Sequence, residues 1–169
     1  MTYIPPSDIA GLGSNILTNG GFETWSNGTS FTNPAASSFS ADQWKQAGTT
    51  TAHTITQEST TIDTGAYSLK WNITSTTGAS VYIQETVNDY KEYLGKTLSL
   101  SMRIKSNAAI QIWITDGITV TYSNSHPGDN TWRTISVSAT ISNSATALGA
   151  AFGYSTITTP VAISFIDSA

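Results

Sequence analysis

The sequence predicts an all-β fold, an antiparallel β-sandwich built by one domain, and three observations support this prediction. The chain has 169 residues and a mass of 17.9 kDa, a length at which one domain buries a substantial core. It contains 28 Thr and 23 Ser, and β-branched Thr packs well on a pleated sheet surface. Alternating apolar and polar residues recur in about nine short segments between turn signals, which suits two sheets of roughly four or five strands each.

The first part of the chain differs from the rest. Residues 1–14 contain two consecutive prolines and a Gly-Leu-Gly-Ser run but little periodicity, which is typical of an extended arm or linker. We therefore expect an N-terminal arm over residues 1–14 and the β-sandwich over residues 15–169.

Two segments show the strand alternation most clearly. In residues 66–73, side chains 67, 69, 71 and 73 are apolar or aromatic and those between them are polar. In residues 98–105, Leu98, Leu100, Met102 and Ile104 alternate with Ser, Arg and Lys. Because strand side chains point to opposite faces in turn, the apolar set of each segment should face the core. Between them, residues 87–94 end at Gly95 and predict one or two turns of helix.

The second half of the chain continues the pattern. Ile110, Ile112 and Ile114 form an inward set, and the following Asp116-Gly117 pair predicts a tight hairpin turn into a strand over residues 118–122. A Pro-Gly-Asp-Asn turn at residues 127–130 precedes three further expected strands. These strands cover residues 132–139, 147–154 and 161–167.

Several short motifs, in a fixed order, carry a resemblance to a known group of domains. They are Asn-Ile-Leu-Thr-Asn-Gly-Gly-Phe-Glu at 15–23 with Trp25, Asp-Gln-Trp at 42–44, Gly-Ala-Tyr-Ser-Leu-Lys at 65–70, Leu-Gly-Lys-Thr-Leu-Ser-Leu-Ser at 94–101, Trp132 and Phe-Ile-Asp at 165–167. Together they resemble jelly-roll carbohydrate-binding modules and related domains of bacteriophage tail and virion-surface proteins. The resemblance implies jelly-roll topology. The last strand ends earlier than in such modules, which predicts a trimmed strand or one completed by a neighbour.

The resemblance also implies a structural calcium ion. Related modules hold this ion where the first strand meets the last, which maps onto Glu23 and Asp167, with Asp42 as a weaker third candidate. Carboxylates are hard oxygen ligands of the kind calcium takes, although full coordination needs about 6–8 oxygens. The alternative is that Glu23 accepts backbone N–H groups in its own turn and that Asp167 is solvated.

Outward-facing aromatic residues are the candidates for carbohydrate recognition, because flat rings stack on the apolar faces of sugars and neighbouring amides reach the hydroxyl groups. If Val81 and Ile83 point inward, Tyr82 and Gln84 point outward. In the same way, the inward Ile set places Gln111 and Trp113 on an outer face. The expected ligand face is therefore Tyr82, Gln84, Gln111 and Trp113. A protein interface at the same face is the alternative.

The remaining Trp and the His residues are expected to be structural. Neither His has metal-binding spacing, so we expect His53 and His126 to be exposed polar residues. Four Trp residues at strand starts or on inward faces are expected in the core: Trp25, Trp44, Trp71 and Trp132.

Composition excludes several classes of protein. The net charge is −4, the seven Lys and Arg are scattered singly, and such a chain has no basic footprint for nucleic acid. Cys is absent, so disulfide frameworks and thiolate metal sites are ruled out. The sequence shows no export signal and no run of 18 apolar residues, which predicts no membrane insertion. Nucleotide-binding and acyl-transfer motifs are missing, and we expect no enzymatic activity.

By resemblance, the expected function is that of a bacteriophage virion-surface structural protein: a tail-fibre, head-fibre or decoration component. Its arm would contact other virion proteins, it would form a homo-oligomer, and its sandwich would adhere to host-surface glycan. The alternative is an extracellular carbohydrate-binding module of a polysaccharide-degrading enzyme. A third reading is a capsid-stabilising clip, in which Tyr82 and Trp113 contact neighbouring subunits.

Overall fold

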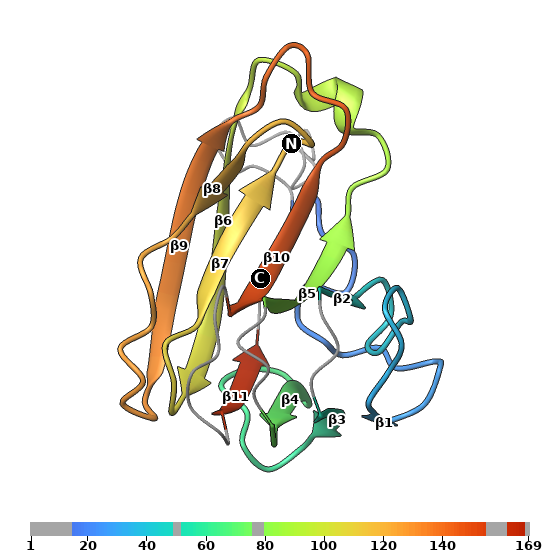
Figure 1. Cartoon of the computed structure of the whole chain (residues 1–169), viewed down its shortest axis with the longest axis vertical. Coiled ribbons are helices and arrows are strands. Elements are labelled where there is room, and N and C mark those ends of the chain that lie inside the picture. Colours follow the sequence, from blue (N-terminus) through green and yellow to red (C-terminus); the bar gives the residue numbers. More distant parts are fainter. Residues whose placement is uncertain (1–14, 49–51, 76–79, 155–161, 168–169) are drawn as a thin grey trace, which may run out of the picture.

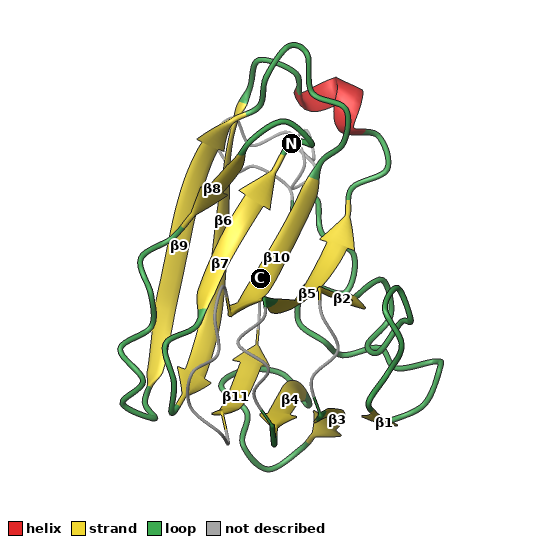
Figure 2. Cartoon of the chain, viewed as in Figure 1, coloured by secondary structure: helices red, strands yellow, loops and turns green. Residues whose placement is uncertain are grey.

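Two antiparallel sheets face each other across one core in the computed structural model, which describes residues 15–48, 52–75, 80–154 and 162–167 (Figure 1). Strands and loops make up this part of the chain, apart from one short helix (Figure 2). The predicted fold class, an antiparallel β-sandwich, is confirmed. The predicted arm, residues 1–14, lies outside the described residues.

The sheets contain six and five strands. In spatial order, the six-stranded sheet consists of β1 (Ser30–Thr32), β3 (His53–Glu58), β4 (Ser68–Ile73), β11 (Ala162–Asp167), β6 (Thr97–Ser106) and β9 (Trp132–Thr140). The five-stranded sheet consists of β2 (Lys45–Gly48), β5 (Val81–Thr86), β10 (Gly149–Tyr154), β7 (Gln111–Thr115) and β8 (Val120–Tyr122). Many neighbours in a sheet are distant in the sequence, and β11 lies between β4 and β6.

The described residues form eleven strands, more than the nine expected. β1 has three residues and β2 has four, too few for an alternating pattern to be recognised. β8 also has three residues, and it lies within the strand predicted over residues 118–122. The predicted helical segment is a single 3₁₀ helix, Tyr90–Tyr93. Gly95 follows it with a φ of 72°, the left-handed conformation that glycine adopts readily at helix ends.

The predicted hairpin joins β7 to β8, but its turn is longer than expected. Thr115 pairs with Val120, so the loop spans four residues, and among its residues Gly117 has a positive φ, of 81°. The Asp116 carboxylate accepts hydrogen bonds from the N–H groups of Ile118 (2.9 Å) and Thr119 (2.7 Å). The turn is therefore stabilised by an acidic side chain that caps backbone donors, rather than by two residues with positive φ.

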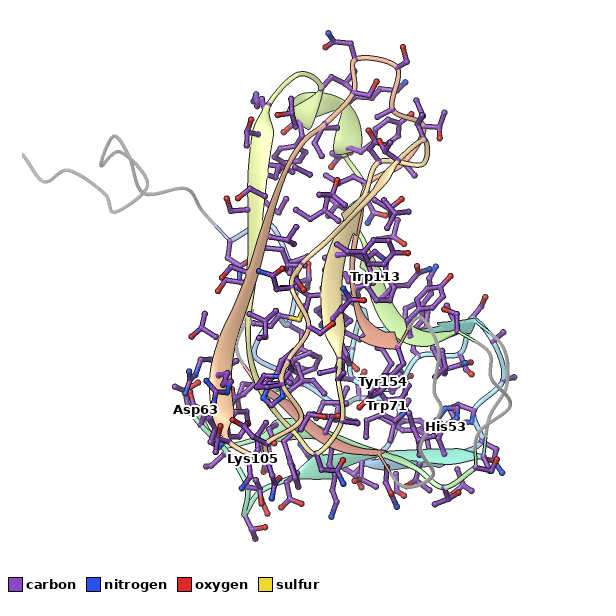
Figure 3. The ribbon with its side chains drawn as sticks, turned by 60° about the vertical axis from the view of Figure 1, so that its left-hand side comes forward. His53, Asp63, Trp71, Lys105, Trp113 and Tyr154 are labelled. Atoms are coloured by element: carbon purple, nitrogen blue, oxygen red, sulfur yellow. The ribbon has the colours of Figure 1, made fainter. Side chains whose placement is uncertain are left out.

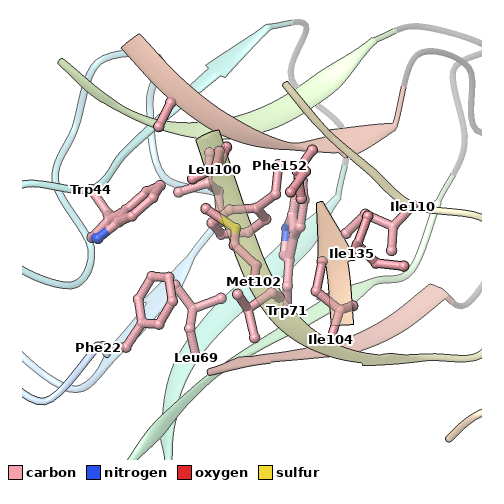
Figure 4. Close-up of a cluster of buried hydrophobic side chains, with 14 of the residues drawn as sticks. Phe22, Trp44, Leu69, Trp71, Leu100, Met102, Ile104, Ile110, Ile135 and Phe152 are labelled. Atoms are coloured by element: carbon pink, nitrogen blue, oxygen red, sulfur yellow. The ribbon is translucent and has the colours of Figure 1, made fainter. Parts of the chain in front are cut away.

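The core lies between the sheets and is rich in aromatic rings (Figure 4). Trp44, Trp71, Phe22 and Phe152 are fully buried. The ring of Phe152 meets that of Trp71 edge to face at 6.1 Å and that of Trp44 at 5.5 Å, arrangements that aromatic quadrupoles favour. In the predicted inward sets, the side chains at positions 69, 71, 73, 100, 102 and 104 are buried as expected, whereas Tyr67 and Leu98 are only partly buried.

A buried hydroxyl cluster also joins the two sheets. Tyr154 of β10 shares a 2.7 Å hydrogen bond with Ser164 of β11, and Ser164 shares one of 2.9 Å with Ser106 of β6. Burial raises the pKa of Tyr154. These hydroxyls satisfy one another in a place where an unpaired polar group would be costly.

Three side-chain predictions are wrong. Trp132 is half-buried and shares the outer face of the six-stranded sheet with its partner Lys105, because its neighbours Ile135 and Val137 occupy the inward positions of β9. Both histidines are buried rather than exposed. The His126 ring accepts the Gly128 N–H at Nδ1 (2.9 Å) and donates from Nε2 to the Thr131 carbonyl (3.0 Å), so it holds two residues of its loop in place.

Within the described ranges, no helix combines the length and the apolar character needed to span a bilayer.

Candidate functional site

The outer face of the five-stranded sheet brings together the four residues predicted to bind ligand. On β5, Val81 and Ile83 point into the core, so Tyr82 and Gln84 face outward. Across β10, Tyr82 lies in the same cross-strand row as Gln111, and Gln84 lies in the same row as Trp113. The face therefore contains two aromatic rings and two amides around one central strand.

The central strand, β10, presents almost no side chain on this face. Its outward positions are Gly149, Ala151 and Gly153, whereas Phe152 and Tyr154 are buried in the core. A Cβ atom at Gly153 would lie 2.6 Å from the Cβ of Tyr82 and 2.4 Å from the Val81 carbonyl oxygen. Glycine at this position leaves space for Tyr82 to lean across the strand.

Three aromatic rings make a continuous row across this face. The ring of Tyr82 lies 5.3 Å from that of Trp113, and the ring of Trp113 lies 5.4 Å from that of Tyr122 on β8. Trp113 points outward as predicted (Figure 3), yet it is only 7% exposed because its two neighbours cover it. Trp113 is thus the base that positions two tyrosine rings, and the tyrosines provide the accessible surface.

The polar side chains beside the row differ in their freedom. Gln111 donates a hydrogen bond of 2.8 Å from Nε2 to the carbonyl of Ser123, which holds its amide in place. Gln84 is half-buried and forms no side-chain hydrogen bond within the described part of the chain. On the neighbouring strand β2, Lys45 pairs with Gln84. An amide and an ammonium group are therefore available next to the aromatic rings.

Sequence reasoning missed two aromatic residues of this face. Tyr122 is 50% exposed and Phe39 is 46% exposed, and they lie at opposite ends of one cross-strand row because Phe39 pairs with Lys45 and Tyr122 pairs with Trp113. Val120, also exposed, adjoins Tyr122 on β8. The predicted hairpin at Asp116 was the sequence signal that could have placed Tyr122 beside β7. Its pairing with Trp113 depends on the length of the hairpin loop, which the sequence did not reveal. Phe39 lies outside any strand and has no local signal.

This arrangement can bind a sugar chain laid across the strands. The exposed Tyr122 ring and the half-buried Tyr82 ring offer apolar surface of the kind that pyranose rings stack on, and Gln84 and Lys45 carry donors for hydroxyl oxygens. The outward positions of the described strands in this sheet carry no Asp or Glu. A pair of carboxyl groups flanking a glycosidic bond, which most glycoside hydrolases use, is therefore not formed by these strands.

The two carboxylates predicted to bind calcium converge on the loop between β3 and β4. Glu23 is exposed and accepts the N–H groups of Ala66 (3.0 Å) and Tyr67 (3.4 Å). Asp167 is 1% exposed and accepts those of Asp63 (2.8 Å) and Thr64 (3.0 Å). Residues near the two ends of the chain are thus joined through one loop. Glu23 accepts N–H groups of this loop and not of its own turn, and Asp167 is buried and not solvated, so neither alternative given above is observed. Among the described residues, no group of three or more acidic, His or Cys side chains is arranged to hold a metal ion, and calcium binding stays a prediction.

Several solved structures are similar to this fold. No protein-family model and no curated protein matches the sequence. The structure of TmCBM61 in complex with β-1,4-galactotriose is similar at 14% identity and a TM-score of 0.58, covering 92% of this chain and 96% of that one. A xylan-binding domain from CBM 22 is similar at 19% identity and a TM-score of 0.53, covering 85% and 93%.

A phage protein is similar as well. The enzymatically active domain of bacteriophage CBA120 tailspike protein 4 has 17% identity and a TM-score of 0.56, over 76% of this chain. The chain spans 20% of that tailspike structure. The fold is therefore that of carbohydrate-binding modules, a β-sandwich also found in a phage tailspike, and the predicted resemblance is confirmed at the level of the fold.

Proposed function

We propose that this chain is a non-catalytic carbohydrate-binding domain that binds a neutral polysaccharide on the outer face of its five-stranded sheet. The observation that carries the proposal is the row of Tyr82, Trp113 and Tyr122, in which the Trp113 ring lies against both tyrosine rings. The uncharged amides of Gln84 and Gln111 flank this row, with the ammonium group of Lys45 beside Gln84, and all three can donate hydrogen bonds to hydroxyl oxygens. The solved structures of similar fold with bound galactotriose and with xylan-binding function support the same ligand class.

Binding is expected to depend on the tyrosines for contact and on Trp113 for their position. Tyrosine supplies large amphipathic area with few rotatable bonds, so little conformational entropy is lost when a ligand covers it. Truncating the half-buried Tyr82 and the exposed Tyr122 together, as Tyr82→Ala with Tyr122→Ala, should weaken binding at least about tenfold, as the loss of aromatic anchors does at interfaces.

The test is isothermal titration of the purified chain with neutral polysaccharides, including β-1,4-galactan and xylan, and with intact bacteria in a sedimentation assay. Tyr90→Ala is the matched control, because it removes a half-buried aromatic side chain from the 3₁₀ helix, outside the ligand face. Saturable binding that is lost in the double variant and retained in the control supports the proposal. No binding to any neutral glycan, or equal binding by the double variant, refutes it.

We further propose that the domain acts on the surface of a bacteriophage virion, as a fibre or decoration component that adheres to host glycan as a homo-oligomer. The similarity in fold to a phage tailspike supports this location, and the similarity to carbohydrate-binding modules supports an enzyme appendage equally. Antibodies against the chain should label intact virions in electron micrographs, and light scattering should give a multiple of 17.9 kDa. Unlabelled particles and a monomeric mass would instead favour a module of a polysaccharide-degrading enzyme.

A further inference from the structure

A second aromatic row crosses the outer face of the six-stranded sheet, on the other side of the sandwich. Phe165 of β11 pairs with Lys70 of β4 on one side and with Lys105 of β6 on the other, and Lys105 pairs with Trp132 of β9. Paired residues share a face, so Lys70, Phe165, Lys105 and Trp132 form one line. Trp113 and Lys105 project from opposite sheets (Figure 3).

The lysines are held against the phenyl ring between them. The Nζ atoms of Lys70 and Lys105 lie 5.7 Å and 5.9 Å from the centroid of Phe165, within the range of cation–π attraction. Lys70 also approaches the Glu58 carboxylate at 3.7 Å. Lys105 forms no ion pair with any described residue. One ammonium group is thus partly neutralised and the other keeps its full charge.

These side chains line a hollow of about 310 Å³. Its lining consists of Thr61, Lys70, Lys105, Asn107, Asn130 and Phe165. A hydroxyl, two amides and two ammonium groups therefore surround one aromatic ring. None of the lining residues is acidic.

The walls of this hollow are fixed by specific contacts. Arg103 donates two hydrogen bonds to the Asp63 carboxylate, from Nε at 2.7 Å and Nη2 at 2.9 Å, and this pair holds the loop that contains Thr61 against the sheet. On the opposite wall, the Asn130 N–H bonds the Ser106 carbonyl at 2.8 Å, with Asn130 at a φ of 58°. The backbone on two sides of the hollow is therefore held in place.

We propose that this hollow is a second carbohydrate site, specific for a sugar residue that bears a negatively charged group. The apolar face of the sugar lies against Phe165, its anionic group lies between the ammonium groups of Lys70 and Lys105, and the amides of Asn107 and Asn130 bind hydroxyls. Charge-assisted hydrogen bonds from lysine to an anion are stronger than neutral ones. The site is independent of the proposed neutral ligand face, from which it is separated by the core.

The test is titration of the full chain with polygalacturonate, dextran sulfate and neutral galactan. Lys70→Gln with Lys105→Gln should weaken binding of the anionic polymer at least about tenfold, because two charge-assisted contacts are lost. Lys91→Gln with Lys96→Gln is the matched control, since it removes two exposed charges from the region of the 3₁₀ helix. The Tyr82 and Tyr122 double variant should bind the anionic polymer as the wild type does, whatever happens to neutral glycan.

The outcomes separate the alternatives. Binding of polygalacturonate alone identifies a carboxylate ligand, and binding of dextran sulfate alone identifies a sulfate. The proposal is overturned if neither polymer binds. It is also overturned if the two double lysine variants weaken polymer binding equally, because that result means attraction to the overall charge of the protein. Removing Lys70 leaves Glu58 without its ion-pair partner and could prevent folding of the double variant. In that case the single variant Lys105→Gln tests the proposal by its loss of anionic polymer binding, since Lys105 has no acidic partner among the described residues.

Discussion

Glu85 should make the protein less stable as the pH rises through neutrality. It occupies an inward position at the end of β5, with 3% of its surface exposed. Its Oε1 accepts the Thr18 N–H at 2.6 Å, while Oε2 is buried without a hydrogen-bond partner. Burial raises the pKa of Glu85 to about 7, and the hydrogen bond from Thr18 opposes part of this rise. The carboxyl group is therefore tolerated when protonated and costly when ionised.

The magnitude follows from the pKa. The ordinary pKa is 4.5 and the folded pKa is about 7, and each pKa unit corresponds to about 1.4 kcal/mol. The folded state holds the Glu85 proton more tightly than the unfolded state does. The contribution of Glu85 to stability is therefore fully present below about pH 4.5 and is lost as the pH rises through about 7. The expected loss of unfolding free energy is about 3 kcal/mol.

Glu85→Gln isolates this effect, because the variant keeps an acceptor for Thr18 and cannot ionise. Urea unfolding at several pH values should show the difference in unfolding free energy, variant minus wild type, growing by about 3 kcal/mol between roughly pH 4.5 and pH 8. Glu92→Gln, which removes an exposed carboxyl group from the 3₁₀ helix, is the control and should show no such growth. A Glu85→Gln difference that stays constant over this range would refute the reasoning.

Three further predictions concern the ligand face, the hairpin and calcium. Gly153→Ala should cost about 1–3 kcal/mol by overpacking and displace Tyr82, which near-ultraviolet circular dichroism and urea unfolding would detect; an unchanged aromatic signal counts against the packing described. Asp116→Ala should lower the unfolding free energy by about 2–3 kcal/mol, because hydrogen bonds to a charged group are lost. The pKa of Asp116 is lowered from 3.8 to about 2, chiefly by the Thr119 N–H. The contribution of Asp116 to wild-type stability should therefore be present above pH 3.8 and vanish as the pH falls through about 2. If Glu23 and Asp167 bind calcium, calcium at 100 times its dissociation constant should add about 2.7 kcal/mol to stability; a melting temperature indifferent to calcium and chelator removes both residues from a metal site.

The strands and the core could be predicted from the sequence because they depend on local alternation. Leu69 and Trp71, or Met102 and Ile104, reveal their inward direction through residues two positions away. The same local rule placed Tyr82, Gln84, Gln111 and Trp113 on the outer face. The rule says which face a side chain takes, and it says nothing about what covers it, so the near-complete burial of Trp113 could not be foreseen.

Which residues become neighbours was decided only by the tertiary structure. Tyr122 and Phe39 join the ligand face through strand pairings that depend on loop length and on an isolated bridge. Lys70, Lys105 and Phe165 are scattered in the chain, and they meet because the last strand, β11, inserts between β4 and β6. Strand order and register arise from contacts between distant segments, where the free energy of burying both sheet faces selects one pairing among many. The sequence by itself therefore determined the fold class, the facing of the strands and four residues of the ligand face, and the tertiary structure determined which residues complete that face and the whole of the second site.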